Sequence, residues 1–276
     1  MRVFSTRLSR DFDEVILVPI ADTHDSDAFA DEKYVDDRIK FIEETPNAFA
    51  LLNGDLMNMA TKNSKSDVYS DKYGPDEQLD RCVERFYPIR EKILGVSEGN
   101  HERRIARDTG IQVTKRFARE LGIEDRYSPG GLYIILRLGQ VRGKKRESNG
   151  SGRIRQICYT IYMTHGARSG RKAGSKVNAL TELSSIVAAD IYIHSHSHLG
   201  AIIPGIANVP DLRNDKITVT DTLFINTAAA LNYGGYGEIG EFQPASKKSP
   251  VIYLCGTRKA MDADLGEKMK WNGCLR

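Results

Sequence analysis

The sequence predicts an α/β protein. Short apolar runs of strand length recur along the chain, and segments whose apolar residues have helical spacing separate several of them. Alternation of this kind is typical of domains that pack helices against sheets. In addition, most of these apolar runs are followed at once by an acidic, amide or imidazole side chain. Open α/β sheets bind their ligands at the carboxyl ends of strands, so these residues are candidates for a site.

Length and composition set the outer limits. At 276 residues the chain fits one large α/β domain or two small ones, and we expect a single domain over residues 1–276. A hydrophobic share of 40% and a charged share of 28% are ordinary for a soluble globular protein. The net charge of +3 is too small to indicate a nucleic-acid-binding protein by itself.

The cellular compartment is predicted from three features that the sequence lacks: a membrane-spanning run, a signal peptide and a CxxC pair. No apolar run reaches the ~18–20 residues that a membrane-spanning helix needs. The first residues contain no apolar core of a signal peptide. The four cysteines form no CxxC pair, which favours reduced thiols over disulfides or a structural zinc site. We therefore expect a cytoplasmic protein without membrane contact.

The first two strands are each followed by an aspartate. Residues 14–21 are predicted to form a buried strand that ends in Asp22-Thr23-His24. Residues 31–44 have helical spacing, and residues 48–52 are predicted to form a second strand that ends in Asn53-Gly54-Asp55. Asp-x-His alone is weak evidence for a site, because such pairs are common in loops.

A third unit repeats the pattern. After a polar loop over residues 57–75, residues 76–93 read as a helix that Pro88 kinks or ends. The next strand leads into Gly99-Asn100-His101-Glu102. Arg103 and Arg104 follow at once, and they either hold an anion or face solvent. Residues 112–121 are expected to form a basic, exposed helix.

Two basic loops flank the next strands. Residues 132–138 and 157–163 are predicted strands, and the linker 142–155 between them is rich in glycine, serine and basic residues. A solvated loop is the favoured interpretation of this linker, and contact with a phosphate backbone is the alternative. The second strand ends at His165-Gly166, and a further basic loop, 167–176, contains Arg168 and Lys172.

Three histidines follow the next buried strand. A helix over residues 179–189 is expected to lead into Asp190–Ile193, after which His194, His196 and His198 stand at every second position. All six histidines of the chain lie in or beside a strand-end motif. Histidine is the commonest metal ligand among side chains, so this distribution indicates a metal site. One polar face of a strand is the alternative for the triplet alone. Residues 216–226 and 251–255 complete the predicted strands.

The ordered set of motifs resembles the calcineurin-like metallophosphoesterases. The motifs are Asp22-x-His24, Gly54-Asp55, Gly99-Asn100-His101-Glu102, His165-Gly166 and His196-x-His198. Each is weak alone, but all five in this order are specific, and they span residues 15–199. The resemblance implies a β-sandwich of two mixed sheets flanked by helices, in four α/β/β/α layers.

The resemblance also implies roles for single residues. Asp55 would bridge two divalent metal ions, whose remaining ligands would be Asp22, His24 and His198 on one and Asn100, His165 and His196 on the other. A hydroxide between the metals would attack phosphorus, and His101 would stand beside the leaving oxygen as a proton donor or stabilising group. Mixed nitrogen and oxygen ligands favour Mn²⁺, with Fe, Zn²⁺ or Mg²⁺ as alternatives.

Two positions depart from the family pattern. Ser195 stands where the family usually has glycine before its last His-x-His, and Glu102 stands where aspartate is frequent. The extra His194 makes the register ambiguous. Counting from Asp190 favours His196 and His198 as the ligand pair, while His194 and His196 remain the alternative.

Function is then predicted as metal-dependent phosphoester hydrolysis. The basic residues Arg103, Arg104, Arg168 and Lys172 favour a phosphodiester, which includes nucleic acid, over a phosphomonoester of a nucleotide or phosphoprotein. A binding protein that has lost catalysis is the third hypothesis, and the full set of ligand types disfavours it.

Overall fold

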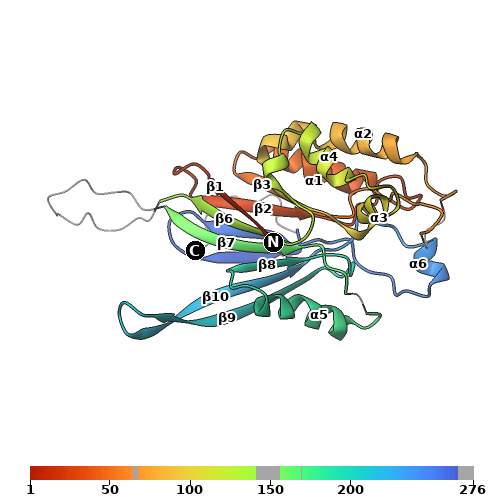
Figure 1. Ribbon diagram of the computed structural model, residues 1–276. Coiled ribbons are helices and arrows are strands. Elements are labelled where there is room, and N and C mark those ends of the chain that lie inside the picture. The colour runs from red at the N-terminus through yellow and green to blue at the C-terminus, as the bar shows by residue number, and fades with distance from the viewer. Residues whose placement is uncertain (65–67, 141–155, 169, 267–276) are drawn as a thin grey trace.

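A computed structural model describes residues 1–64, 68–140, 156–168 and 170–266 of the chain. Two mixed six-stranded sheets pack face to face (Figure 1). The first sheet has the strand order β1-β6-β7-β8-β10-β9. Its strands are β1 (Arg2–Arg7), β6 (Leu132–Leu138), β7 (Ile157–Thr164), β8 (Ile191–His194), β10 (Lys216–Asn226) and β9 (Ala201–Asp211).

The second sheet has the order β12-β11-β2-β3-β4-β5. Its strands are β12 (Met261–Asp264), β11 (Val251–Cys255), β2 (Glu14–Ile20), β3 (Ala48–Asn53), β4 (Ile93–Ser97) and β5 (Tyr127–Ser128). Strands β2 to β5 run parallel, as do β7, β8 and β10 in the first sheet.

Helices cover the outer faces of both sheets (Figure 1). Helices α1 (Glu32–Glu44), α2 (Pro75–Phe86) and α4 (Val113–Glu120) lie over the second sheet, and α5 (Ala173–Thr181) lies against the first. The remaining helical segments are α3 (Asn100–Thr109), α6 (Tyr236–Ile239) and the 3-10 helices η1 (Tyr87–Lys92), η2 (Glu124–Arg126) and η3 (Glu182–Ser185). The predicted four-layer sandwich is therefore confirmed.

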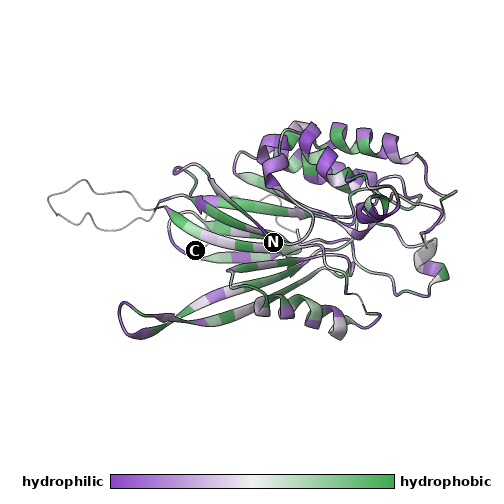
Figure 2. Cartoon of the chain, viewed as in Figure 1, coloured by the Kyte–Doolittle hydropathy of each residue, from purple (hydrophilic) through white to green (hydrophobic). Residues whose placement is uncertain are grey.

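Apolar side chains form an inner core and two outer ones. The inner core fills the space between the sheets, with Leu17, Leu51, Ile134 and Ile193 among its buried members. A second core lies between the second sheet and its helices, and a small one lies beneath α5. Figure 2 shows the matching pattern: helices α1, α2 and α4 carry hydrophilic residues alternating with hydrophobic ones, as expected of helices with one buried face.

Several predicted elements differ from the observed ones. The helix predicted over 76–93 ends at Phe86, and Pro88 lies in the following η1, because proline cannot continue an α-helical hydrogen-bond ladder. The helix predicted over 179–189 begins earlier, as α5, inside the segment expected to be a basic loop. Helix α4 is not simply exposed, since Val113 and Phe117 are buried.

Strand ends decide where the polar motifs meet. Strands β2, β3, β4, β7 and β8 all end at the same edge of the sandwich, where their following loops come together. Within the described part of the chain, no helix combines the length and apolarity required to cross a membrane.

Candidate metal centre

Five loops bring the predicted ligands together. Each loop follows one of the strands named above, and each carries one motif of the set. Asp22 and His24 follow β2, Asp55 follows β3, Asn100 and His101 open α3 after β4, His165 follows β7, and His196 and His198 follow β8. Three overlapping groups of their side chains have nitrogen and oxygen atoms within 4.8 Å of one another.

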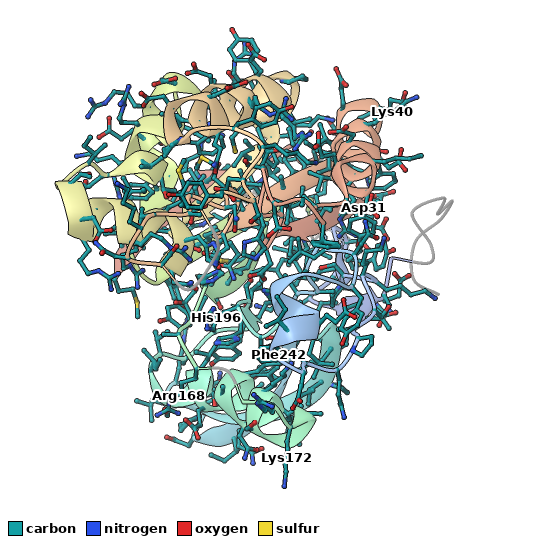
Figure 3. The ribbon with its side chains drawn as sticks, turned by 90° about the vertical axis from the view of Figure 1, so that its right-hand side faces the viewer. Asp31, Lys40, Arg168, Lys172, His196 and Phe242 are labelled. Atoms are coloured by element: carbon teal, nitrogen blue, oxygen red, sulfur yellow. The ribbon has the colours of Figure 1, made fainter. Side chains whose placement is uncertain are left out.

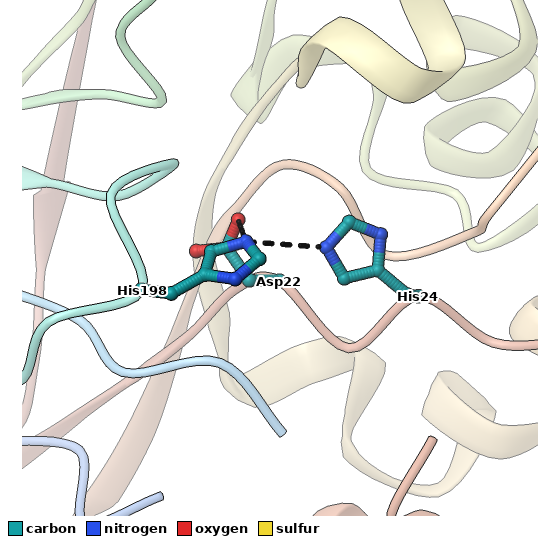
Figure 4. A group of neighbouring side chains, drawn as sticks. All are labelled: Asp22, His24 and His198. Atoms are coloured by element: carbon teal, nitrogen blue, oxygen red, sulfur yellow. Dashed lines mark hydrogen bonds and ion pairs between the residues drawn. The ribbon is translucent and has the colours of Figure 1, made fainter. Parts of the chain in front are cut away.

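The first group is Asp22, His24 and His198, which Figure 4 shows pointing toward one another from two loops. The Nε2 atom of His198 lies 3.4 Å from Oδ1 of Asp22 and 3.4 Å from Nε2 of His24. Asp22 and His24 are buried, whereas the side chain of His198 is 37% exposed. The group thus has two buried members and one that is partly exposed to solvent.

The second group is Asp55, His165 and His196. Nε2 of His165 lies 3.1 Å from Oδ2 of Asp55 and 3.1 Å from Oδ1 of Asn100, so Asn100 also belongs to this cluster. The same nitrogen is 3.9 Å from Oδ1 of Asp22, which places the two groups side by side.

His101 belongs to a third group, with His24 and Asp55. Its Nδ1 lies 2.8 Å from the carbonyl oxygen of Asn58. Because a carbonyl only accepts, Nδ1 must carry the hydrogen, which leaves Nε2 facing the cluster. That Nε2 is 3.8 Å from Oδ2 of Asp55. His101 therefore presents its second nitrogen at the edge of the cluster.

Backbone strain is concentrated in this cluster. Asp22, His24, Asp55, His196 and His198 all have positive φ angles, of 51°, 44°, 50°, 65° and 55°. Positive φ is uncommon for residues other than glycine and costs on the order of 1–3 kcal/mol when the surroundings enforce it. Five such residues among seven predicted ligands indicate that the fold holds these side chains in place at the expense of local stability.

Two glycines allow the loops to touch. Gly54 has φ +81°, and a Cβ there would contact the backbone of Gly99 and Nδ1 of His165. A Cβ on Gly99 would in turn overlap the backbone nitrogen and carboxylate of Asp55. Neither position accepts a side chain, because the backbones of the loops after β3 and β4 are in direct contact and the ring of His165 packs against Gly54.

The pKa values of the clustered side chains favour the binding of cations. Burial is the largest influence on the pKa of Asp55 and raises it, but His165, His101 and His24 together lower it well below the usual value. Burial opposes a charge on His165, yet the carboxylates of Asp55 and Asp22 raise its pKa to about 10. The pKa of His24 is lowered well below its usual value, chiefly by burial.

The protein atoms fit divalent metal ions. Oδ1 of Asp22 and Nδ1 of His24 are buried without a hydrogen-bond partner among the described residues. The histidine nitrogens nearest to this carboxylate oxygen, at 3.4 and 3.9 Å, make no hydrogen bond to it, and a buried oxygen in that position is costly unless a cation completes its surroundings. The imidazole of His24 is neutral and suited to ligation, and a bound cation would take the place of the proton on His165. Oxygen and imidazole donors without thiolate match Mn²⁺, Fe or Zn²⁺.

Glu102 has a role that sequence reasoning missed. Its buried carboxylate accepts the backbone N–H groups of Leu56 at 2.7 Å, Met57 at 3.0 Å, Asp55 at 3.1 Å and Gly99 at 3.2 Å. Burial raises the pKa of Glu102 to about 7, with the charge of Asp55 adding to this effect and the N–H of Met57 opposing it. One carboxylate thus holds the Asp55 loop against the start of α3. The only sequence signal was its place three residues after Gly99, as in a capping box.

The structure brings His196 and His198 to the cluster and leaves His194 outside it. Strand β8 ends at His194, whose Nδ1 lies 3.0 Å from Oδ1 of Asn226. A Cβ on Gly166 would overlap its Nε2, so that nitrogen faces backbone. The strand geometry, in which alternate side chains share a face, therefore ends at His194, before the loop that carries His196 and His198.

The predicted basic residues are divided between the site and the surface. Arg104 is half-buried, and its pKa is lowered by burial while the charges of Asp55 and Glu102 oppose that shift, which places it beside the cluster. Arg103 donates to the carbonyl oxygen of Pro129 at 2.8 Å, and Arg168 forms an ion pair with Glu182.

Lys172 is exposed immediately before α5. Figure 3 shows Lys172 and Arg168 toward the lower end of the view, with His196 and Phe242 above them near its centre. The linker 142–155 lies outside the described residues.

No protein-family model and no curated protein sequence matches this chain. Solved structures similar to it include vacuolar protein sorting 29 from Cryptosporidium parvum, at 12% identity, with 91% of this chain and 98% of that chain covered and a TM-score of 0.39. A metallophosphoesterase from Sphaerobacter thermophilus is 10% identical, with 87% and 83% covered and a TM-score of 0.38. The Pseudomonas putida nuclease MPE is 12% identical, with 89% and 85% covered and a TM-score of 0.34.

The chain has the two-sheet fold and the ordered strand-end motifs that its resemblance to the calcineurin-like metallophosphoesterases implies.

Proposed function

We propose that this protein is a metal-dependent phosphoesterase with two adjoining divalent-ion sites. The observation that supports the proposal most is that one nitrogen lies close to both ligand groups. Nε2 of His165 is 3.1 Å from the carboxylate of Asp55 and 3.9 Å from that of Asp22. Asp22, His24 and His198 would hold one ion. Asn100, His165 and His196 would hold the other, with Asp55 between the two. When bound, such ions stabilise negative charge on a transferring phosphoryl group and lower the pKa of bound water.

The protein side chains supply orientation and a proton. Asn53 accepts a hydrogen bond from Nδ1 of His165 through its carbonyl oxygen at 2.8 Å, which turns Nε2 of that histidine toward Asp55. His101 is held in the same way by Asn58, so only its Nε2 can exchange a proton with a group in the site. When protonated, this nitrogen would donate to the leaving oxygen of the ester.

The start of α3 adds to binding of an anion. The N–H of His101 donates to Oδ1 of Asp55 at 2.8 Å, so the amino end of this ten-residue helix points at the cluster. The partial positive charge at a helix amino terminus favours carboxylates and phosphates nearby. Arg104, beside Asp55, contributes a full positive charge to the same region.

Phosphodiesters are the proposed substrate class. The basic residues extend beyond the metal-ligand cluster to the start of α5, where Arg171 lies 5.4 Å from the centre of the Phe242 ring and Phe242 is 38% exposed. Exposed aromatic rings beside cations suit a chain of nucleotides, because bases stack on rings while phosphates bind the cations. A phosphomonoester needs only one charged recess and gains nothing from such an extended surface.

Hydrolysis of two artificial esters tests the proposal. Bis-p-nitrophenyl phosphate is a diester and p-nitrophenyl phosphate a monoester, and both should be assayed with Mn²⁺ and with EDTA. We expect Mn²⁺-dependent hydrolysis that is faster for the diester and falls below detection in Asp55→Asn. The matched control, Asp80→Asn, changes an exposed aspartate of α2 and should retain wild-type rates.

Each other outcome contradicts a stated part of the proposal. Activity retained in Asp55→Asn contradicts the assigned ligands. Faster hydrolysis of the monoester contradicts the diester preference but not the phosphoesterase. Equal rates in Mn²⁺ and in EDTA contradict metal dependence.

A further inference from the structure

Ser195 occupies the junction between the two sheets beneath the ligand loops. It follows β8 directly, and the resemblance leads one to expect glycine there. Its side chain has no exposed surface. A buried hydroxyl must find hydrogen-bond partners or it destabilises the fold, so its surroundings show what it contributes.

A short chain of buried polar side chains passes through this serine. The hydroxyl of Ser97 donates to Oδ1 of Asn53 at 2.5 Å, and Nδ2 of Asn53 donates to Oγ of Ser195 at 2.6 Å. The hydroxyls of Ser195 and Thr227 lie 2.8 Å apart. All four residues have 0% exposure. Ser97 and Asn53 belong to the second sheet, whereas Ser195 and Thr227 follow strands of the first, so the chain joins the two sheets.

Asn53 connects this chain to His165. Its amide group is fully engaged: Oδ1 accepts from Ser97, and Nδ2 donates both to Ser195 and to the carbonyl oxygen of Thr164, at 3.0 Å. Its own carbonyl oxygen accepts Nδ1 of His165 at 2.8 Å. The backbone N–H of Ser195 donates to the carbonyl oxygen of His165 at 3.2 Å. The orientation of the His165 ring therefore depends on contacts that Ser195 makes on both sides.

Ser195 also begins the loop that carries His196 and His198. Its carbonyl oxygen accepts the N–H of Ser197 at 2.7 Å, and Nζ of Lys176 donates to the carbonyl oxygen of Ser197 at 2.7 Å. Both histidines of this loop have positive φ angles. Strained backbone persists only where several surrounding contacts hold it in place. The bond between Ser195 and Asn53 is one such contact, and it links the start of this loop to the other sheet.

We propose that Ser195 is a positioning residue of the metal centre, which joins the His165 loop to the His196–His198 loop through Asn53. This inference rests on the proposed function, because it assumes that these histidines bind metal. Glycine at this position would leave one N–H of Asn53 without its acceptor and would free the backbone of the ligand loop. In this chain the hydroxyl therefore contributes to metal affinity without touching the metal.

The test measures metal binding directly. Co²⁺ is titrated into metal-free wild type, Ser195→Ala and Ser195→Gly, and the visible absorption of bound Co²⁺ reports both affinity and ligand geometry. Loss of a partner that orients a metal ligand typically costs about 10–100-fold in affinity, and we expect this range with an altered spectrum for both variants. Circular dichroism confirms that each variant is folded before titration.

A matched pair of threonines separates positioning from general destabilisation. Thr227→Val removes the hydroxyl next to Ser195 and should weaken Co²⁺ binding in the same direction. Thr160→Val is the control: its hydroxyl lies 2.9 Å from Oδ2 of Asp190, in β7 but away from the ligand loops. We expect this control to lose stability without a change in Co²⁺ affinity.

The outcomes distinguish the two proposals. Wild type that binds no Co²⁺ overturns the proposed metal centre and this inference with it. Wild type that binds Co²⁺ while Ser195→Ala binds it with equal affinity and an identical spectrum leaves the metal centre standing and overturns the positioning role alone. Equal weakening in Thr227→Val and Thr160→Val likewise overturns it.

Discussion

Replacing Glu102 with glutamine removes one acceptor oxygen and keeps the shape of the side chain. In the wild type Oε1 accepts two N–H groups, at 2.7 and 3.0 Å, and Oε2 accepts two more, at 3.1 and 3.2 Å. Glutamine has one oxygen, which should take the shorter pair of bonds to Leu56 and Met57. Its NH₂ group would then face the N–H groups of Asp55 and Gly99, donor against donor.

The magnitude follows from these two buried donors. Each buried donor left without an acceptor costs about 1–3 kcal/mol, or about 2–6 kcal/mol for the two. Glutamine also removes a buried charge whose pKa is raised to about 7, and at pH 8 this relief offsets roughly half of that cost. The free energy of unfolding should therefore fall by about 1–3 kcal/mol. The loss acts on the backbone of Asp55 itself, and metal affinity should fall as well. The matched control is Glu98→Gln, since Glu98 accepts the hydroxyl of Tyr127 at 2.6 Å and glutamine can still accept it.

Urea unfolding of metal-free protein at pH 8, followed by circular dichroism, measures the effect. This pH lies above the pKa of about 7 for Glu102, so the wild-type side chain is a carboxylate. We expect this net loss for Glu102→Gln and a smaller one for Glu98→Gln. A Glu102→Gln protein within about 0.5 kcal/mol of wild type, the range of ordinary surface changes, would refute the role assigned to this carboxylate.

Three further predictions concern stabilisation by metal, the pH dependence of stability and the backbone conformation of Gly54. Mn²⁺ at 100 times its dissociation constant should stabilise the fold by about 2.7 kcal/mol, and an unchanged melting temperature relative to EDTA would contradict the metal centre. Burial raises the pKa of Glu14 to about 7, so the native state binds the proton more tightly and stability falls as pH rises from about 4.5 to 7. Glu14→Gln should therefore stabilise by about 1 kcal/mol at pH 8, allowing for solvent screening, and by little at pH 4.5; equal effects at both values, measured by urea unfolding, would count against this. Gly54→Ala should cost about 2–5 kcal/mol from its positive φ and overpacking, whereas Gly130→Ala, with open space around it and no positive φ, should be nearly neutral in thermal unfolding.

His194 shows where sequence reasoning reached its limit. Counting from Asp190 favours His196 and His198 as the ligand pair, but the spacing of two residues by itself fits all three histidines on one face of a strand. The structure separates them because β8 ends at His194, whereas His196 and His198 adopt positive φ angles in the following loop. Where a strand ends depends on its neighbours in the sheet, here β7 and β10, which are distant in sequence.

Two adjacent arginines show the same limit of sequence-based prediction. Arg103 and Arg104 are adjacent in sequence, but they point to different surroundings: Arg103 bonds the carbonyl oxygen of Pro129, and Arg104 lies beside Asp55. Consecutive residues of a helix face directions about 100° apart, and α3 was not predicted as a helix. Without its helix, neither arginine could be assigned a direction.

Local patterns of residues were enough to predict the chemical types of the candidate site and the strands that carry them. Apolar runs such as residues 14–21 and 48–52, each with its aspartate behind, are local patterns that burial in a sheet explains. The way in which the loops are held depends on contacts between segments that are distant in sequence. Glu102 accepts hydrogen bonds from four backbone N–H groups, and Ser195 joins the two sheets through Asn53. Their partners lie up to 142 residues away, and no local pattern encodes contacts that form only when separate strands end at one edge.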